Sequence, residues 1–375
     1  MHRAAAVVAV SLAAIAACSS SATPIGSPTT TTGTSAGASP PVSAVGSRSA
    51  SASAVPVSPS PGLPRIRATI RGDGPIIASD SGPAGHPYAL PAAFAESADG
   101  TAVLFVVWLA ETPGQQVVTM ATTRDGSAWT VDLTLVLTDL GLGFGPPGPV
   151  PSSVVRLDHG SWVLYGWGSA VSDRGQFVTW RATARDLGGP WTADPEPVLT
   201  AGPAGAWDSA SVAGSTVIRD ETGWSMWFDG DAGGSGIRGE IGLATSTDGR
   251  TWDRWDDPTT TEAGDPVVHK GACGAATAGS VGQPQVWRTT SGDRMLFAGL
   301  PVGLAVSSVF GATSLDGRGW SCAAAAPLLL AADIPGSGGL HRIRGGTLAG
   351  RPVLFVESLA GQGSAIWLAD IDLGG

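Results

Sequence analysis

Two kinds of side chain in this sequence could act on a ligand. Carboxylates can exchange protons as general acid and general base, and tryptophan rings can stack on the apolar face of a sugar. The candidates are far apart in the sequence, so only the fold can bring them together. The carboxylates are Asp208, Glu111 and Glu357, and the candidates for substrate binding are Trp207, Trp108, Trp167, Asp229, Gln283, His341 and Arg342.

A repeated turn predicts the fold that positions these residues. The phrase Asp-Gly-x-x-Trp returns at intervals of roughly 60–70 residues, with a degenerate copy that ends at Trp191. Short apolar or alternating runs, typical of β-strands, lie between the copies. A period of this length carried by short strands predicts a radial array of sheets, a β-propeller. The clear copies are Asp125–Trp129, Asp248–Trp252 and Asp316–Trp320.

Five periods of four strands each can be counted along the chain. The fifth period ends after its third strand, Ala365–Ala369, while the strand Ile66–Ile70 has no blade of its own. We expect this N-terminal strand to complete the last blade, because an unpaired edge would otherwise remain. The predicted fold is therefore an all-β, five-bladed β-propeller whose last blade is closed by the N-terminal strand. The clearest runs, expected as second strands, are Ala102–Leu109, Trp162–Trp167, Trp224–Phe228, Arg294–Ala298 and Pro352–Val356.

The first 64 residues are expected to lie outside the propeller, which occupies 65–375. Residues 1–17 have the pattern of a lipoprotein signal peptide, with an apolar run too short to span a bilayer. Small residues precede Cys18, where we expect lipid attachment; the alternative is an ordinary signal peptide with a coincidental cysteine. Residues 18–64 are rich in Ser, Thr, Pro, Ala and Gly, which predicts a disordered tether. The expected protein is exported and lipid-anchored to the outer side of a bacterial cell membrane.

Charge and cysteine content argue against several partners. The net charge is −10, Lys270 is the only lysine and no basic stripe exists, which argues against nucleic acid. Cys273 and Cys322 are the only cysteines after Cys18, and in an exported protein they predict a disulfide rather than a metal pair. The histidines are scattered, so neither a metal nor another cofactor is expected. A monomer is the default expectation.

Blade topology separates the repeated turns from the candidate site. If successive strands alternate in direction, the Asp-Gly turns lie on one face, and the inner-strand entries and the loops after second strands lie on the other. We interpret the turns as structural, with the tryptophan filling the space between blades. The candidate site residues belong to the opposite, functional face. For each tryptophan there, packing between blades is the alternative to sugar stacking.

Residues 206–268 resemble a blade of the five-bladed propeller glycosidases, a group that includes arabinanases, β-xylosidases and invertase-like enzymes. The resemblance rests on Trp207-Asp208-Ser209, on Ser225–Gly230 and on Ile241–Trp252. It implies a carbohydrate ligand, and cleavage of the glycosidic bond by two carboxyl groups with opposed tasks.

Within that resemblance, only Asp208 matches a family position, as base or nucleophile. Glu111 and Glu357 are the candidates for the acid, although neither lies in a family-like motif. The second blade departs from the family pattern, because its inner-strand entry, Gly148–Ser152, contains no acid. Asp208 also has a structural alternative, in which it hydrogen-bonds inner-strand backbone or caps the Trp207 turn.

Two functions therefore remain open. In the first, a surface lipoprotein recognises carbohydrate, and, if it is an enzyme, it is a glycoside hydrolase. In the second, a non-catalytic propeller binds a glycan or a protein partner in the cell envelope. The position of Asp208 relative to a glutamate across the funnel should discriminate between them.

Overall fold

The computed structural model describes residues 65–112, 115–134, 137, 140–142, 144–169, 176–233, 239–261 and 264–374. The predicted signal peptide, Cys18 and the tether lie outside these residues. The described chain consists of β-strands and two single-turn 3₁₀ helices, η2 (Ala275–Thr277) and η3 (Ala331–Asp333), which confirms the all-β class. None of its helices is long and apolar enough to cross a membrane.

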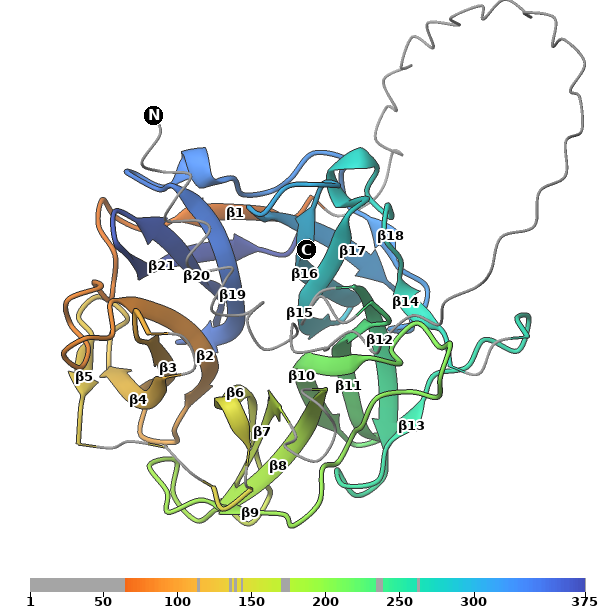
Figure 1. Ribbon diagram of the computed structural model, residues 1–375, viewed down its shortest axis with the longest axis horizontal. Helices are drawn as coiled ribbons and strands as arrows, with labels where there is room; N and C mark the ends of the chain where they lie inside the picture. Colours follow the sequence, from red (N-terminus) through yellow and green to blue (C-terminus); the bar gives the residue numbers. More distant parts are fainter. Residues whose placement is uncertain are drawn as a thin grey trace, which may run out of the picture.

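The strands form sheets that are arranged radially around a common centre (Figure 1). Three of these sheets are built of antiparallel neighbours that mostly follow one another along the chain, from the centre outward. One sheet contains β6 (Gly145–Arg156), β7 (Trp162–Ser169), β8 (Phe177–Ala184) and β9 (Thr192–Ala193). The next contains β10 (Ser211–Asp220), β11 (Gly223–Asp231), β12 (Glu240–Ser246) and β13 (Asp253–Arg254), with β14 (Pro266–Val268) paired to β12. A further sheet contains β15 (Ser280–Thr289), β16 (Gly292–Leu300), β17 (Ser308–Ser314) and β18 (Ser321–Cys322).

The remaining sheet joins the two ends of the chain. A single parallel bridge, Tyr88 to Ser364, connects its two halves. The expected N-terminal strand is present, and β1 pairs antiparallel with β21, from Arg67 opposite Asp372 to Ile70 opposite Ala369. One half contains β2 (Tyr88–Glu96), β3 (Ala102–Leu109), β4 (Gln116–Thr123) and β5 (Thr130–Asp132). The other contains β19 (Gly339–Leu348), β20 (Arg351–Ala360), β21 (Gly363–Asp372) and β1 (Arg67–Ile70).

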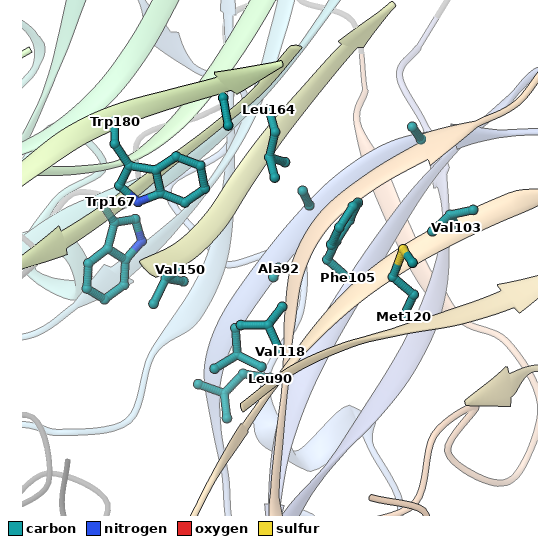
Figure 2. Close-up of a cluster of buried hydrophobic side chains, with 14 of the residues drawn as sticks. Leu90, Ala92, Val103, Phe105, Val118, Met120, Val150, Leu164, Trp167 and Trp180 are labelled. Atoms are coloured by element: carbon teal, nitrogen blue, oxygen red, sulfur yellow. The ribbon is translucent and has the colours of Figure 1, made fainter. Parts of the chain in front are cut away.

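The middle strands are apolar along nearly their whole length because a neighbouring group of strands packs on each of their faces. In β3 every residue but the last is buried, although successive side chains point to opposite faces. Figure 2 shows one such interface, in which Phe105 and Val118 of β3 and β4 face Val150 and Trp167 of β6 and β7. The core is thus a set of inter-sheet interfaces.

The innermost strands contact one another in a ring. Strand β2 contacts β6, β6 contacts β10, β10 contacts β15, β15 contacts β19, and β19 contacts β2 (Figure 1). Residues of all of these strands line an axial cavity of about 160 Å³, among them Phe94, Ser153, Thr216, Gln285 and Gly346. Each innermost strand also carries a register shift, which re-aims the side chains near its entry.

The Asp-Gly turns have the geometry expected for structural turns. Asp248 Oδ1 accepts the backbone N–H groups of Arg250 and Thr251, both at 2.8 Å, and Gly249 has a φ of 70°. The other two turns repeat this pattern, with Asp125 Oδ1 accepting from Ser127 and Asp316 Oδ1 accepting from Arg318. Positive φ favours glycine at the second position of each turn.

The repeated tryptophans pack edge-on against an aromatic ring of the preceding group of strands. This arrangement includes the first and last groups, because Trp129 contacts Phe355 of β20. The interpretation that these residues fill the space between blades is confirmed. The pairs are Trp129–Phe355 at 5.6 Å, Trp191–Phe105 at 6.2 Å, Trp252–Tyr165 at 5.9 Å and Trp320–Trp227 at 6.5 Å between ring centroids.

We expect these turns to make stability depend on acid pH. The pKa of Asp125 is lowered from 3.8 to about 2, mainly by the hydrogen bond that the Ser127 backbone N–H donates to it. The pKa of Asp248 is also lowered, mainly by the hydrogen bond from the Thr251 backbone N–H. A carboxylate whose pKa is lower in the folded state stabilises the folded protein at pH values above its unfolded-state pKa. This stabilisation is lost as the pH falls through the folded-state pKa. The melting temperature should therefore fall less between pH 4 and pH 2 in Asp125→Asn than in wild type. Parallel curves would contradict this.

Cys273 and Cys322 form the predicted disulfide, with Cα atoms 5.7 Å apart and a sequence separation of 49. It links the segment before η2 to β18, the outer strand of the sheet formed by β15 to β18. Replacing both cysteines with alanine should lower the free energy of unfolding by about 2–4 kcal/mol, because the unfolded chain is no longer cross-linked. Urea unfolding measures this, and wild type with dithiothreitol should reproduce the loss. Equal midpoints with and without the bond would contradict it.

Candidate functional site

Most of the predicted site residues meet in one buried cluster around the axis. We call it the axial cluster and define it by Trp167, Asp229, Gln283, His341, Arg342, Arg344 and Glu357. Its members come from β7, β11, β15, β19 and β20. Every group of strands around the centre therefore contributes a residue, except the group formed by β2 to β5.

Gln283 connects three strands of the cluster. It lies in the register shift of β15 and has a φ of 55°, which is uncommon for a residue other than glycine. Its backbone N–H donates to Asp229 Oδ1 at 2.6 Å, and its side-chain Nε2 donates to the His341 carbonyl at 3.2 Å. Its Oε1 accepts from the Ile343 N–H at 2.8 Å. The strained backbone is therefore held by contacts on both neighbouring strands.

His341 and Glu357 form the polar pair at the entry of β19. His341 Nδ1 lies 3.2 Å from Glu357 Oε2, and the two side chains are 11% and 2% exposed. The shift between Leu340 and Ile343 in β19 is the local reason that His341 and Arg342 are presented next to each other. Glu357 is thus the one predicted glutamate in the axial cluster.

Two arginines from β19 carry the positive charge of the cluster. The Cζ atom of Arg342 lies 5.2 Å from the centroid of the Trp167 ring, a cation–π contact that reaches β7 from β19. Burial lowers the pKa of Arg342, and Glu357 and Asp229 oppose that change. Burial also lowers the pKa of Arg344 to about 10, and repulsion from Arg342 adds to the effect.

Arg344 is the functional candidate that sequence reasoning missed. It follows Arg342 by two residues, in a strand otherwise made of apolar residues, glycine, histidine and threonine. That spacing of two charges in an innermost strand was the available signal.

Asp208 lies outside the axial cluster and already has a partner. Its Oδ2 accepts from Arg254 Nε at 2.8 Å, and Arg254 belongs to the outer strand β13. Arg254 Nη2 also donates to the carbonyl of Thr200, so Arg254 contacts two residues of the loop before β10. Asp208 thus has a structural partner, but that partner is the Arg254 side chain on an outer strand and not the inner-strand backbone that the structural alternative named.

The other predicted residues outside the cluster also have structural settings. Trp207 stacks on Phe228 with ring centroids 5.6 Å apart and donates from Nε1 to the Gly264 carbonyl at 2.9 Å. Trp108 is fully buried and donates from Nε1 to Thr119 Oγ1 at 2.8 Å, which favours packing over sugar stacking. Glu111 is exposed on the bend after β3.

Among the described residues, no group of three or more His, Cys, Asp or Glu side chains is placed to hold a metal ion. The axial cluster itself contains guanidinium, imidazole, amide and carboxylate groups.

Neither a family model nor a curated protein sequence matches this chain. Solved structures do match it. A complex of BT0996 with RGII aligns with a TM-score of 0.61 and 14% identity, covering 82% of this chain and 92% of the other. A family 117 glycoside hydrolase, Zg3597 from Zobellia galactanivorans, gives 0.55 and 14%, covering 83% and 91%. An exo-1,5-α-L-arabinanase from a bovine ruminal metagenomic library gives 0.52 and 16%, covering 77% and 94%.

The chain has the fold of the propeller-type glycosidases. This confirms the resemblance recognised in the sequence. At these identities the likeness concerns the fold, because one such fold can carry several functions.

Proposed function

We propose that this protein is an exported lipoprotein whose propeller binds carbohydrate at the axial cluster without hydrolysing it. In this proposal residues 1–17 are the signal peptide, 18–64 the tether and 65–375 a monomeric five-bladed propeller. The pairing of β1 with β21 and the ring of inner-strand contacts support five blades closed by the N-terminal strand. Fatty-acid labelling of cells tests the lipid anchor. We expect the wild type to incorporate the labelled fatty acid and Cys18→Ala to incorporate none.

The ion pair between Asp208 and Arg254 is the observation that carries the choice of binding over hydrolysis. Glycosidases place two carboxyl groups about 5–10 Å apart on either side of the bond. Here the predicted base is engaged by a cation from an outer strand, and Glu111 is exposed outside the axial cluster. Only Glu357 of the predicted catalytic acids remains there, beside His341.

Carbohydrate as the ligand is supported by the chemistry of the axial cluster and by the fold. Charged and amide groups from several strands converge where the inner strands begin, as recognition of many hydroxyl groups requires. The structures that share this fold include glycoside hydrolases and the complex of BT0996 with RGII. Within the pair, the His341 side chain is more exposed than that of Glu357.

Hydrolysis is the second candidate, and one observation favours it. Asp229 and Glu357 are both buried, and both act electrostatically on Arg342, so the cluster does contain two acids. In this alternative Glu357 and Asp229, rather than Asp208, would act on the glycosidic bond.

Equilibrium binding to a broad panel of oligosaccharides tests the proposed function. We expect the purified mature chain to bind a defined subset, and Glu357→Gln to bind at least tenfold more weakly, because removing the charge disrupts the pair with His341. Glu111→Gln is the matched control and should bind as wild type does. No binding to any oligosaccharide would contradict the proposal and leave a protein partner as the alternative.

A further inference from the structure

The guanidinium groups of Arg342 and Arg344 are buried and carry unused hydrogen-bond donors. The two residues are 6% and 4% exposed. Arg342 Nε and both Nε and Nη1 of Arg344 have no hydrogen-bond partner in the part of the chain that the structure describes. No described carboxylate lies within 4.0 Å of either group, whereas Arg181 and Arg254 do have such ion pairs. Both arginines therefore retain hydrogen-bond donors that nothing in the described chain uses.

The acids of the cluster are directed to other donors. Asp229 Oδ1 accepts the Gln283 N–H, and Glu357 Oε2 lies beside His341 Nδ1. They reach the arginines only through longer-range attraction, while Arg342 and Arg344 repel each other. Leaving a buried donor unpaired is costly, and more so for a charged group. An anion between the two guanidinium groups would remove both penalties.

Along β19 these arginines lie between a partly exposed residue and the axial cavity. His341, whose side chain is 11% exposed, precedes them, and Gly345, Gly346 and Thr347 follow and line the cavity. That cavity of about 160 Å³ has room for about five water molecules at ~30 Å³ each. Arg342 and Arg344 thus lie between the entry of the inner strand and an open space on the axis.

We propose that Arg342 and Arg344 form an oxyanion site on the axis, and that the carbohydrate ligand is an acidic sugar whose carboxylate binds there. The planar guanidinium group presents N–H donors in a fork that matches a carboxylate, which makes arginine suited to this task. The acidic-sugar part rests on the proposed function. The oxyanion part does not, because an inorganic anion has the same chemistry.

Titration calorimetry at constant ionic strength tests this with four ligands: sodium galacturonate, galactose, sodium sulfate and sodium chloride. The purified mature chain should bind galacturonate at least tenfold more tightly than galactose. Arg344→Met should lose at least tenfold in affinity for galacturonate, and Arg344→Lys, which keeps the charge but not the fork, should bind more weakly than wild type. Arg250→Met is the control, because Arg250 is 60% exposed and distant in sequence, and it should bind as wild type does.

The outcomes separate this inference from the proposed function. Sulfate binding that is lost in Arg344→Met, with no binding of any sugar, supports the oxyanion site and overturns the carbohydrate ligand. Galactose binding equal to that of galacturonate and unchanged in Arg344→Met overturns the inference and leaves the proposed function standing. Binding of none of the four, or chloride binding equal to that of galacturonate, also overturns it. If Arg344→Met does not fold, as judged by circular dichroism, Arg344→Lys decides.

Discussion

Replacing Trp227 with alanine is expected to lower the free energy of unfolding by about 3–5 kcal/mol, because a buried ring disappears from an interface between two groups of strands. Trp227 lies on β11 and is 1% exposed. Its ring meets that of Trp320 edge-on, and its Nε1 donates to the Gly317 carbonyl at 3.1 Å. The substitution therefore leaves a cavity and removes this hydrogen bond to the repeated turn of the next group.

Urea unfolding followed by tryptophan fluorescence measures this effect, with Trp227→Phe as the matched control. Phenylalanine keeps an aromatic ring at the interface and removes the hydrogen bond to Gly317, so it should cost clearly less than alanine. If Trp227→Ala lost less than about 1 kcal/mol, the turn–aromatic contacts would not hold adjacent groups together.

Removing the N-terminal strand is expected to abolish cooperative folding. A chain that starts at Gly72 lacks the partner of β21, whose edge would then be unpaired. It also lacks Ile66, which is 4% exposed and packs in the same apolar cluster as Leu296 and Trp367. The ion pair between Arg71 and Asp370 is lost with it.

Thermal unfolding of this chain beside one that starts at Arg65 is the measurement. The shorter chain should show no sharp transition, whereas the longer one should unfold in a single step. Point substitutions in this strand should have smaller effects. Ile66→Ala should lower the free energy of unfolding by about 2–5 kcal/mol, and Arg67→Ala, at an exposed position, by less than about 0.5 kcal/mol. Equal melting temperatures for the two chains would show that the β1–β21 pairing does not hold the ends together.

Much of the architecture could be predicted from the sequence because it is encoded locally. The Asp-Gly turn specifies its own hydrogen bonds and positive φ, and its tryptophan returns once per group of strands. The predicted strand Ala102–Leu109 coincides with β3, because a continuous apolar run bounded by turns is distinctive. The partner of β21 could be inferred from the missing strand at the end of the chain.

The site was harder to predict because its contacts join distant segments. The motif at Trp207 and Asp208 suggested a catalytic residue at the entry of an inner strand. The cation that binds Asp208 is Arg254 on an outer strand, and the motif does not show that this strand contacts Asp208. Trp108 and Trp207 are aromatic residues near the expected funnel, and only the structure shows that the Trp108 ring is fully buried and that the Trp207 ring stacks on Phe228. Arg344 was missed because a buried arginine is improbable unless its surroundings are known.

Product release from a panel of oligosaccharides and aryl glycosides, including uronates, tests the central claim most directly. The purified mature chain, Glu357→Gln and Asp208→Asn would be incubated side by side with the ligands that bind. We expect the wild type to bind, with no product above background in any of the three proteins. Turnover by the wild type that disappears in Glu357→Gln or in Asp208→Asn would contradict it and establish a glycoside hydrolase.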